Sequence, residues 1–384
     1  MTVRLAAALL LVTGPSWLVP SGRASDVVVR QHRDADTKGP LPVFRSGKWG
    51  YIAPSGAIAI APQFEEAGFF YEDRAAVRVN GRWGYIDTSG RLMVPPHFSA
   101  AARFSDGVAH VRWSVGGDER SAAGYVDVTG QIVLRCEPGS PDVHLTAARC
   151  GRQFLGGYVA EAVEVFRCVD EFGNPKEYPC RATLIDRWGY YDKSGRLAIP
   201  GPFHSGASRF SDGLAGVQRY GEKGVGFIDE SGEFAIAPTY DQVAAFSEGL
   251  AAVRLGGTWG FIDRRGQPVV ERRFQSVSDF SNGYATARLD GAWGYLDRTG
   301  RFAISPRFQE AAPFSEGLAA VCCDGDSTRY IDAAGRWAFE TVLPRGIANG
   351  GRFVEGVALV ELRGVGGAYI DRVGRVVAPL RSPD

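Results

Sequence analysis

Short runs of apolar residues, each ended by a turn sequence, recur along most of this chain. The run 75–79 ends at Asn80-Gly81, and a second run, 83–87, follows at once. Asn-Gly tolerates the two positive φ angles of a type I′ turn, so we expect the two runs to form a β-hairpin. Clear copies at 255–266 and 289–300 indicate a repeat architecture.

A Tyr or Phe that follows a Trp-Gly pair, or the place of that pair, marks each copy. Most successive markers lie 34 to 40 residues apart, and two insertions account for the one longer gap. Nine units are therefore expected, with markers at Tyr51, Tyr85, Tyr125, Tyr190, Phe227, Phe261, Tyr295, Tyr330 and Tyr369.

Arg and Trp residues share one face of the predicted hairpins. A two-residue loop sets the register, which places an Arg directly opposite a Trp in three units. These pairs are candidates for cross-strand stacking and for an exposed binding strip, although aromatic columns are also typical of a core between units. The residues of this candidate strip are Arg78 with Trp83, Arg254 with Trp259, and Arg288 with Trp293.

A second turn, Asp-x-x-Gly, follows each hairpin. Asp at the first position and Gly at the fourth are typical of a type I turn, so a third strand should complete an antiparallel meander. Proline near its end, as at Pro95, is expected to stop that strand. Turn chemistry also explains the aspartates better than a carboxylate ring for metal binding or catalysis. They are Asp87, Asp127, Asp192, Asp229, Asp263, Asp297, Asp332 and Asp371.

The connector to the next unit has aromatic or small residues at every third position, as at Phe308, Ala311 and Phe314. This period is neither that of a strand nor that of an α-helix, so we expect an irregular or 3₁₀-like link. A Ser-acid-Gly turn such as 315–317 follows it.

The predicted fold is all-β, a tandem array of about nine three-stranded, blade-like meanders. Nine units exceed the usual four to eight blades of a propeller, and no terminal strand looks shared between the first and last units. We therefore favour an open, curved array, with a closed β-propeller as the alternative.

These motifs resemble the WG (KWG) repeat of bacterial proteins, as in 48–52, 83–87 and 246–253. The resemblance covers about residues 41–380. Some units depart from it, since Arg329 and Ala368 stand where the glycine is expected. The resemblance implies a non-catalytic repeat domain that mediates interactions, and it implies no particular reaction.

The amino-terminal residues have the pattern of a cleaved secretory signal peptide. Arg4 precedes an apolar run that is too short to span a bilayer, and small residues end at Ala24. We expect a signal peptide at 1–24, a flexible linker at 25–40 and a short tail at 381–384. The protein should therefore be secreted or periplasmic, without insertion in the membrane after cleavage.

A cysteine-containing insertion is expected at about 136–187. Cys168 and Cys180 are equidistant from Asn174, so a symmetric hairpin would set them opposite each other. We predict one disulfide between them and, by proximity, a second between Cys136 and Cys150; zinc is less favoured because no Cys-x-x-Cys occurs. The state of the adjacent Cys322 and Cys323 is left open.

Composition narrows the classes of partner. The formal net charge is zero and the pI is about 7.0, which gives no electrostatic footprint for nucleic acid. No spacing indicates a metal or a cofactor. The leading hypothesis is a scaffold for an unidentified protein or cell-envelope glycan. The alternatives are a carbohydrate-binding module that uses the Trp–Arg strip and, less favoured, a propeller-type hydrolase or lyase.

Overall fold

The computed structural model describes residues 39–114, 121–136, 158–168, 182–192, 196–204, 207–322, 328–339, 346–364 and 366–380, without the side chains of 121, 136, 158–168, 182–187 and 202. The expected signal peptide, most of the linker and the tail lie outside these residues. Every described residue belongs to one compact unit, which begins at His32. Within the described ranges no helix could cross a membrane.

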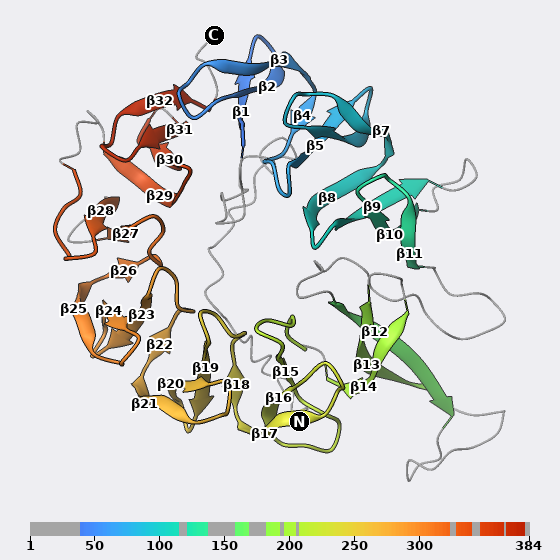
Figure 1. Ribbon diagram of the computed structural model, residues 1–384, viewed down its shortest axis with the longest axis vertical. Coiled ribbons are helices and arrows are strands. Elements are labelled where there is room, and N and C mark those ends of the chain that lie inside the picture. Colours follow the sequence, from blue (N-terminus) through green and yellow to red (C-terminus); the bar gives the residue numbers. More distant parts are fainter. Residues whose placement is uncertain are drawn as a thin grey trace, which may run out of the picture. The chain divides into compact units, whose positions relative to one another are not determined.

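The strands follow one another as antiparallel meanders in chain order (Figure 1). The first three units contain β1 (Leu41–Arg45), β2 (Lys48–Ile52) and β3 (Ile58–Phe64); β4 (Glu66–Ala67), β5 (Arg74–Val79), β6 (Arg82–Asp87) and β7 (Leu92–Phe98); and β8 (Ala100–Ser105), β9 (Val108–Ser114), β10 (Ser121–Asp127) and β11 (Ile132–Cys136).

The middle three units keep this plan. They contain β12 (Tyr158–Cys168), β13 (Ala182–Asp192) and β14 (Leu197–Phe203); β15 (Ala215–Val217), β16 (Val225–Ile228) and β17 (Phe234–Tyr240); and β18 (Gln242–Val243), β19 (Leu250–Leu255), β20 (Thr258–Asp263) and β21 (Pro268–Phe274).

The last three units differ at their end, where strands β26 to β32 form one seven-stranded sheet. These units contain β22 (Ser276–Val277), β23 (Tyr284–Leu289), β24 (Ala292–Asp297) and β25 (Phe302–Phe308); β26 (Glu310–Ala311), β27 (Leu318–Cys322) and β28 (Thr328–Asp332); and β29 (Ile347–Val354), β30 (Val357–Leu362), β31 (Gly366–Asp371) and β32 (Val376–Pro379). The all-β tandem array of meanders is thus confirmed.

The first hairpin of each unit has the predicted register where its two-residue loop is intact. Asn80 and Gly81 both have positive φ, at 50° and 73°, as a type I′ turn requires. Arg78 consequently lies opposite Trp83, and Val77 lies opposite Gly84.

The third strand runs past its prolines, so the prediction that proline ends it was wrong. Strand β7 continues through Pro95 because three residues there bulge opposite the single residue Gly84. The bulged backbone comes very close: a Cβ atom on Gly84 would lie 2.5 Å from the carbonyl oxygen of Val94. The glycine of the Trp-Gly pair is therefore required by close approach rather than by a positive φ.

The connector is more regular at its start than the sequence indicated. In four units its first residues form a short additional strand against the next hairpin, as β4 does against β5. The strand forms because the outer edge of β5 has backbone groups to satisfy; Glu65 N–H, for example, donates to Arg78 O.

Both faces of each meander are buried between neighbouring units. The face that carries Ala75 and Val77 packs with Tyr51 of the preceding unit. Tyr85, on the other face, packs with Phe104 of the following one. All nine marker aromatics are almost inaccessible to solvent. The shared core is thus a series of clusters between consecutive units.

Buried tyrosine hydroxyls add a repeated hydrogen bond to these clusters. Burial raises the pKa of Tyr85, so its hydroxyl stays protonated and donates to the carbonyl oxygen of Ala102 in the next connector at 2.7 Å. Equivalent bonds come from Tyr51, Tyr190, Tyr295 and Tyr330.

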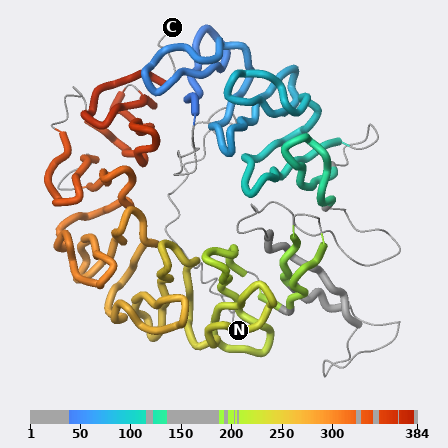
Figure 2. Tube along the Cα trace, viewed as in Figure 1, coloured from blue at the N-terminus to red at the C-terminus, as the bar shows by residue number. Residues whose placement is uncertain are grey.

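The two ends of the repeat region are in contact. No sheet of the described residues combines strands from both ends, as the open array implies. Yet Tyr369 Oη donates to Pro42 O at 3.0 Å, and Phe44 N–H donates to Leu380 O at 2.8 Å. The last strands, red in Figure 2, accordingly lie beside blue β1, and their residues share one hydrophobic cluster with it. These are the contacts that the closed alternative requires.

The turn aspartates act as the sequence indicated. Asp87 Oδ1 accepts hydrogen bonds from the backbone N–H and hydroxyl of Ser89 and from the N–H of Arg91. Each of the eight predicted aspartates accepts the same backbone bond from the residue four positions later.

These bonds predict an acid-sensitive fold. The hydroxyl two residues on is the largest cause that holds the pKa of Asp87, Asp229 and Asp297 below its usual value. Because the folded pKa lies below the unfolded one, near 3.9, the stabilisation is complete above about pH 4 and is lost as pH falls through the folded pKa. Thermal unfolding followed from pH 6 to pH 2 should show this loss, and the triple Asp→Asn variant should show less of it. An unchanged pH profile in that variant would contradict the assignment.

Candidate functional site

The tryptophans of the predicted strip lie between units rather than on an open face. Trp83, Trp259 and Trp293 are partly buried and pack against the clusters of their units. In the register of the third strand, Trp83 lies opposite Phe98.

The arginines of the strip have partners other than the tryptophans. Arg78 forms an ion pair with Glu66, Arg254 donates to the side chain of Gln242, and Arg288 donates to Gly291 O. Among the cation–π contacts of the described residues, none joins these arginines to the Trp opposite. The register therefore brings each Arg–Trp pair together without stacking it.

The predicted cysteine pairs fall largely outside the described residues, which include neither Cys150, Cys180 nor Cys323. The register of β12 and β13 does correct one premise, because Cys168 lies opposite Ala182 and not opposite Cys180. The hairpin is shifted by two residues from the symmetric one that the cysteines suggested. Within the described ranges, no group of His, Cys, Asp or Glu is arranged to bind a metal ion.

Unit eight departs from the repeat where Arg329 replaces the glycine of the Trp-Gly pair. In units one to three and five to seven no room exists for a side chain at this position, since a third-strand carbonyl oxygen lies 2.4 to 2.6 Å from an added Cβ; unit nine has Ala368 there. The chain accordingly takes a longer path here: Thr328 pairs with Ile347, whereas the equivalent Trp293 pairs with Phe308. The Arg329 guanidinium lies over the ring of Trp337, 3.9 Å from its centroid.

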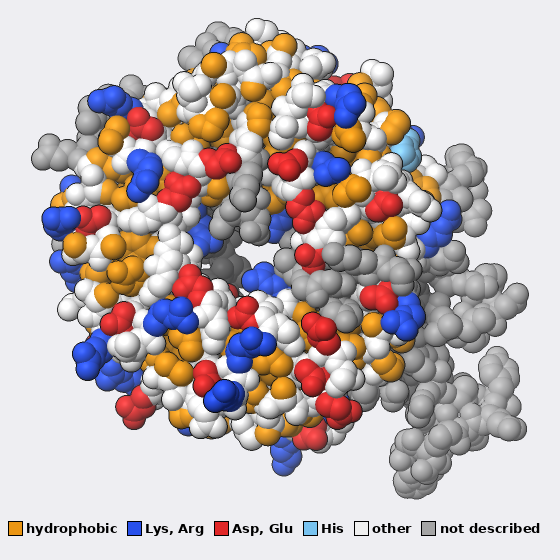
Figure 3. Space-filling view, in the orientation of Figure 1, with side chains coloured by type: hydrophobic (Ala, Val, Ile, Leu, Met, Phe, Trp, Pro, Cys, Tyr) orange, Lys and Arg blue, Asp and Glu red, His pale blue; other side chains and the backbone are white. Residues whose placement is uncertain are grey.

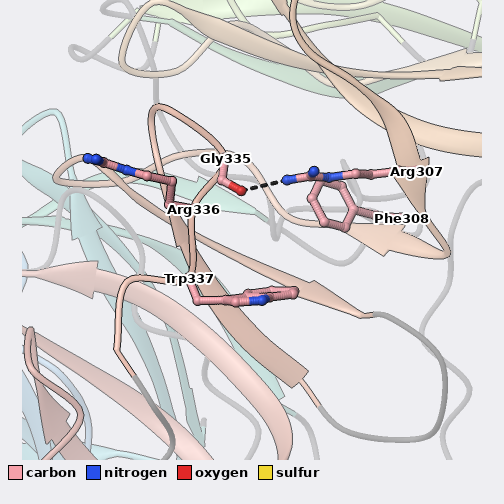
Figure 4. A pocket seen from close by; sticks show the side chains of 5 residues that line it. All are labelled: Arg307, Phe308, Gly335, Arg336 and Trp337. Atoms are coloured by element: carbon pink, nitrogen blue, oxygen red, sulfur yellow. Dashed lines mark hydrogen bonds between the residues drawn. The ribbon is translucent and has the colours of Figure 1, made fainter.

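A pocket lies where this unit meets the preceding one (Figure 4). Its volume is about 430 Å³, within the roughly 300–1,000 Å³ of small-molecule sites. Phe308 and the Arg307 guanidinium lie on one side of it and the Trp337 indole on the other. Gly335 and Arg336, from the Asp-x-x-Gly turn, complete the lining.

The equivalent space between units six and seven is filled. There Phe302, at the strand position of Trp337, packs edge-on against Phe274 with ring centroids 5.9 Å apart. No such ring contact joins Trp337 to Phe308 within the described part of the chain. Trp337 instead stacks with Arg329 and remains 42% exposed. At this junction Trp337 therefore contacts the arginine that replaces the glycine instead of the aromatic ring of the preceding unit.

The pocket is cationic. Arg336 is neutralised by Asp332, with 2.9 Å between Nη2 and Oδ2. Arg307 donates to the carbonyl oxygen of Gly335 at 2.5 Å, a bond that orients the guanidinium without cancelling its charge. Among the ion pairs of the described residues, none includes Arg307 or Arg329. On the face that Figure 3 shows, charges of both signs are interspersed.

The sequence contained one signal for this pocket, the loss of the Trp-Gly pair at Arg329. In the sequence, that departure marks unit eight as an atypical copy and does not by itself indicate a pocket. Trp337 and Arg307 carry no sequence signal, because neither belongs to the Trp-Gly columns. Only the structure places them in neighbouring units around one opening.

Comparison with protein families identifies the repeat. The family described as WG containing repeat matches residues 49–83, 83–112, 188–222, 226–259, 259–291 and 293–325, which together make up more than half of the chain. No curated protein matches the chain.

Solved structures of similar fold have little sequence identity. A eukaryotic initiation factor is 13% identical, with a TM-score of 0.52 over 88% of this chain and 95% of its own. The designed protein Ika8 is 14% identical, with a TM-score of 0.43 over 73% and 85%. BamB from Moraxella catarrhalis is 12% identical, with a TM-score of 0.34 over 79% and 96%. Only the first score exceeds 0.5, and at such identity it concerns the fold alone.

Proposed function

The chain belongs to the WG containing repeat family, and we propose that it is a non-catalytic scaffold that binds a protein or glycan partner of the cell envelope after secretion or export to the periplasm. The observation that supports this proposal is the pocket around Trp337. An exposed tryptophan beside uncompensated arginines has the composition of a recognition site.

The choice of this pocket over the Trp–Arg strip follows from burial. Trp83, Trp259 and Trp293 contribute to the packing of units, so their removal would weaken the fold. Trp337 is exposed and already stacked on Arg329, so a partner can contact it without rearrangement of the core.

Affinity capture from an envelope extract tests the proposal. The full chain, immobilised, should retain a partner that the Trp337→Ala variant loses by about tenfold or more, as for a central aromatic contact. The matched control is Ile58→Ala, which removes a side chain at the same strand position in unit one that is also exposed.

Two further results decide where recognition occurs. Equal capture by the wild type and by Trp337→Ala would contradict a role for the pocket. Loss of capture only when Val169–Pro179 is replaced by a short turn would move recognition to the cysteine-containing insertion at 136–187. Each variant should first show the thermal midpoint of the wild type.

The carbohydrate-binding alternative gains support from the same side chain. An exposed indole face suits the C–H face of a sugar ring, which the half-buried tryptophans of the strip suit less well. A glycan array probed with the wild type and with Trp337→Ala tests this alternative. Binding that the variant loses would support it, and no binding to any glycan would count against it.

A further inference from the structure

We propose that the Trp337 pocket binds a sugar ring that carries a carboxylate, such as a uronic acid residue of an acidic glycan, with Trp337 as the stacking platform and Arg307 as the carboxylate partner. This inference rests on the proposed function and adds the chemical class of the ligand.

The charge of Arg307 indicates that the ligand carries an anionic group. Arg307 keeps donors beyond the one that it gives to Gly335 O, because a guanidinium has five N–H groups in a planar fork. A carboxylate matches that fork with two parallel hydrogen bonds. Arg336 is a poorer candidate because Asp332 already occupies its Nε and Nη2 atoms.

The shape of the pocket indicates that the ligand contains a ring. The opening lies between the Arg307–Phe308 side and the indole of Trp337, so a ligand must be flat enough to lie against the indole and reach the guanidinium (Figure 4). The Arg329 guanidinium lies over one face of the Trp337 ring, 3.9 Å from its centroid, so the other face is the one that a ligand can use. A platform that is held before binding loses little side-chain entropy when a ligand arrives.

The junction between units six and seven offers a comparison within the described residues. Arg273 occupies the same strand position in unit six and lies over Phe274 as Arg307 lies over Phe308, at 5.3 and 5.0 Å. At that junction Phe302 fills the space. Arg273 therefore supplies an internal control that shares the contact with the neighbouring phenylalanine but faces a junction where Phe302 packs against Phe274.

Calorimetric titration of the full chain with oligogalacturonate, and with a neutral glucose oligosaccharide of equal length, tests the proposal. We expect binding of the acidic chain, a loss of about tenfold or more in the Arg307→Gln variant, and weakening at high salt. The Trp337→Ala variant should lose binding, and Arg273→Gln should bind as the wild type does. Thermal midpoints exclude unfolding as the cause.

Several results would overturn the inference. Equal affinity for the neutral chain, or an unaffected Arg307→Gln variant, would remove the carboxylate contact. If neither oligosaccharide binds while envelope capture still depends on Trp337, this inference is wrong and the proposed function is still supported. Preferential binding of a peptide with a free terminal carboxylate would assign the pocket to a protein partner instead. If the wild-type chain neither binds oligogalacturonate nor captures a partner that depends on Trp337, both proposals are wrong.

Discussion

Replacement of Gly84 by alanine is expected to destabilise the protein by about 3 kcal/mol or more, the upper range for overpacking. The added methyl would lie 2.5 Å from Val94 O and 2.8 Å from Pro96 N, both of them backbone atoms of the bulged third strand. A flexible side chain could move aside, but this backbone is held by its pairing with β6. Chemical unfolding with fluorescence detection measures the loss.

Gly81→Ala in the same hairpin provides the matched control. Gly81 has a positive φ of 73° and no atom within 4 Å of an added Cβ, so alanine there costs only the backbone preference, about 1 kcal/mol. A loss at Gly84 no greater than that at Gly81 would show that the third strand can retreat. The role assigned to the Trp-Gly glycine would then be wrong.

Truncation of Tyr369 to alanine is expected to cost about 4 kcal/mol, as for a large buried aromatic. The side chain is fully buried, and its hydroxyl donates to Pro42 O, so the loss should concentrate where the last unit meets the first. Hydrogen exchange of backbone amides in β1 and β31 should accelerate more than exchange in β20. That gradient distinguishes an interface between the chain ends from a uniform contribution to the core.

Tyr369→Phe separates the ring from the hydroxyl. It keeps the packing but leaves an acceptor without its donor, so a loss of about 1–3 kcal/mol is expected. Phe227 and Phe261 occupy the same position in two other units, which indicates that a ring without hydroxyl is compatible with the fold. Exchange that accelerates equally in all units would contradict the proposed interface.

The local geometry of the repeat followed from short sequence patterns. Asn80-Gly81 can adopt two positive φ angles, and Asp87 with Gly90 forms the second turn, so strand order and register were predictable from a few residues. The family followed from the same motifs. Local patterns were informative here because each unit uses contacts between residues close in sequence.

Other features of the fold depended on how neighbouring strands pair, which the sequence pattern does not show. The run of β7 through Pro95 could not be predicted, since proline usually ends a strand unless a bulge receives it, and that bulge exists because Gly84 lacks a side chain. The short strand β4 likewise depends on a free edge of β5. Hairpin symmetry misplaced Cys168 because the register of β12 and β13 is set along their whole length.

The sequence by itself determined the repeat, its hairpins and turns, and the family to which the chain belongs, because those depend on torsional preferences and on periodicity within some tens of residues. Tertiary structure alone decided the contact between Tyr369 and Pro42 and the pocket around Trp337. Both join residues through the packing of whole units. A pattern read along one chain does not contain the distance between Arg307 and Trp337, which the stacking of neighbouring sheets sets.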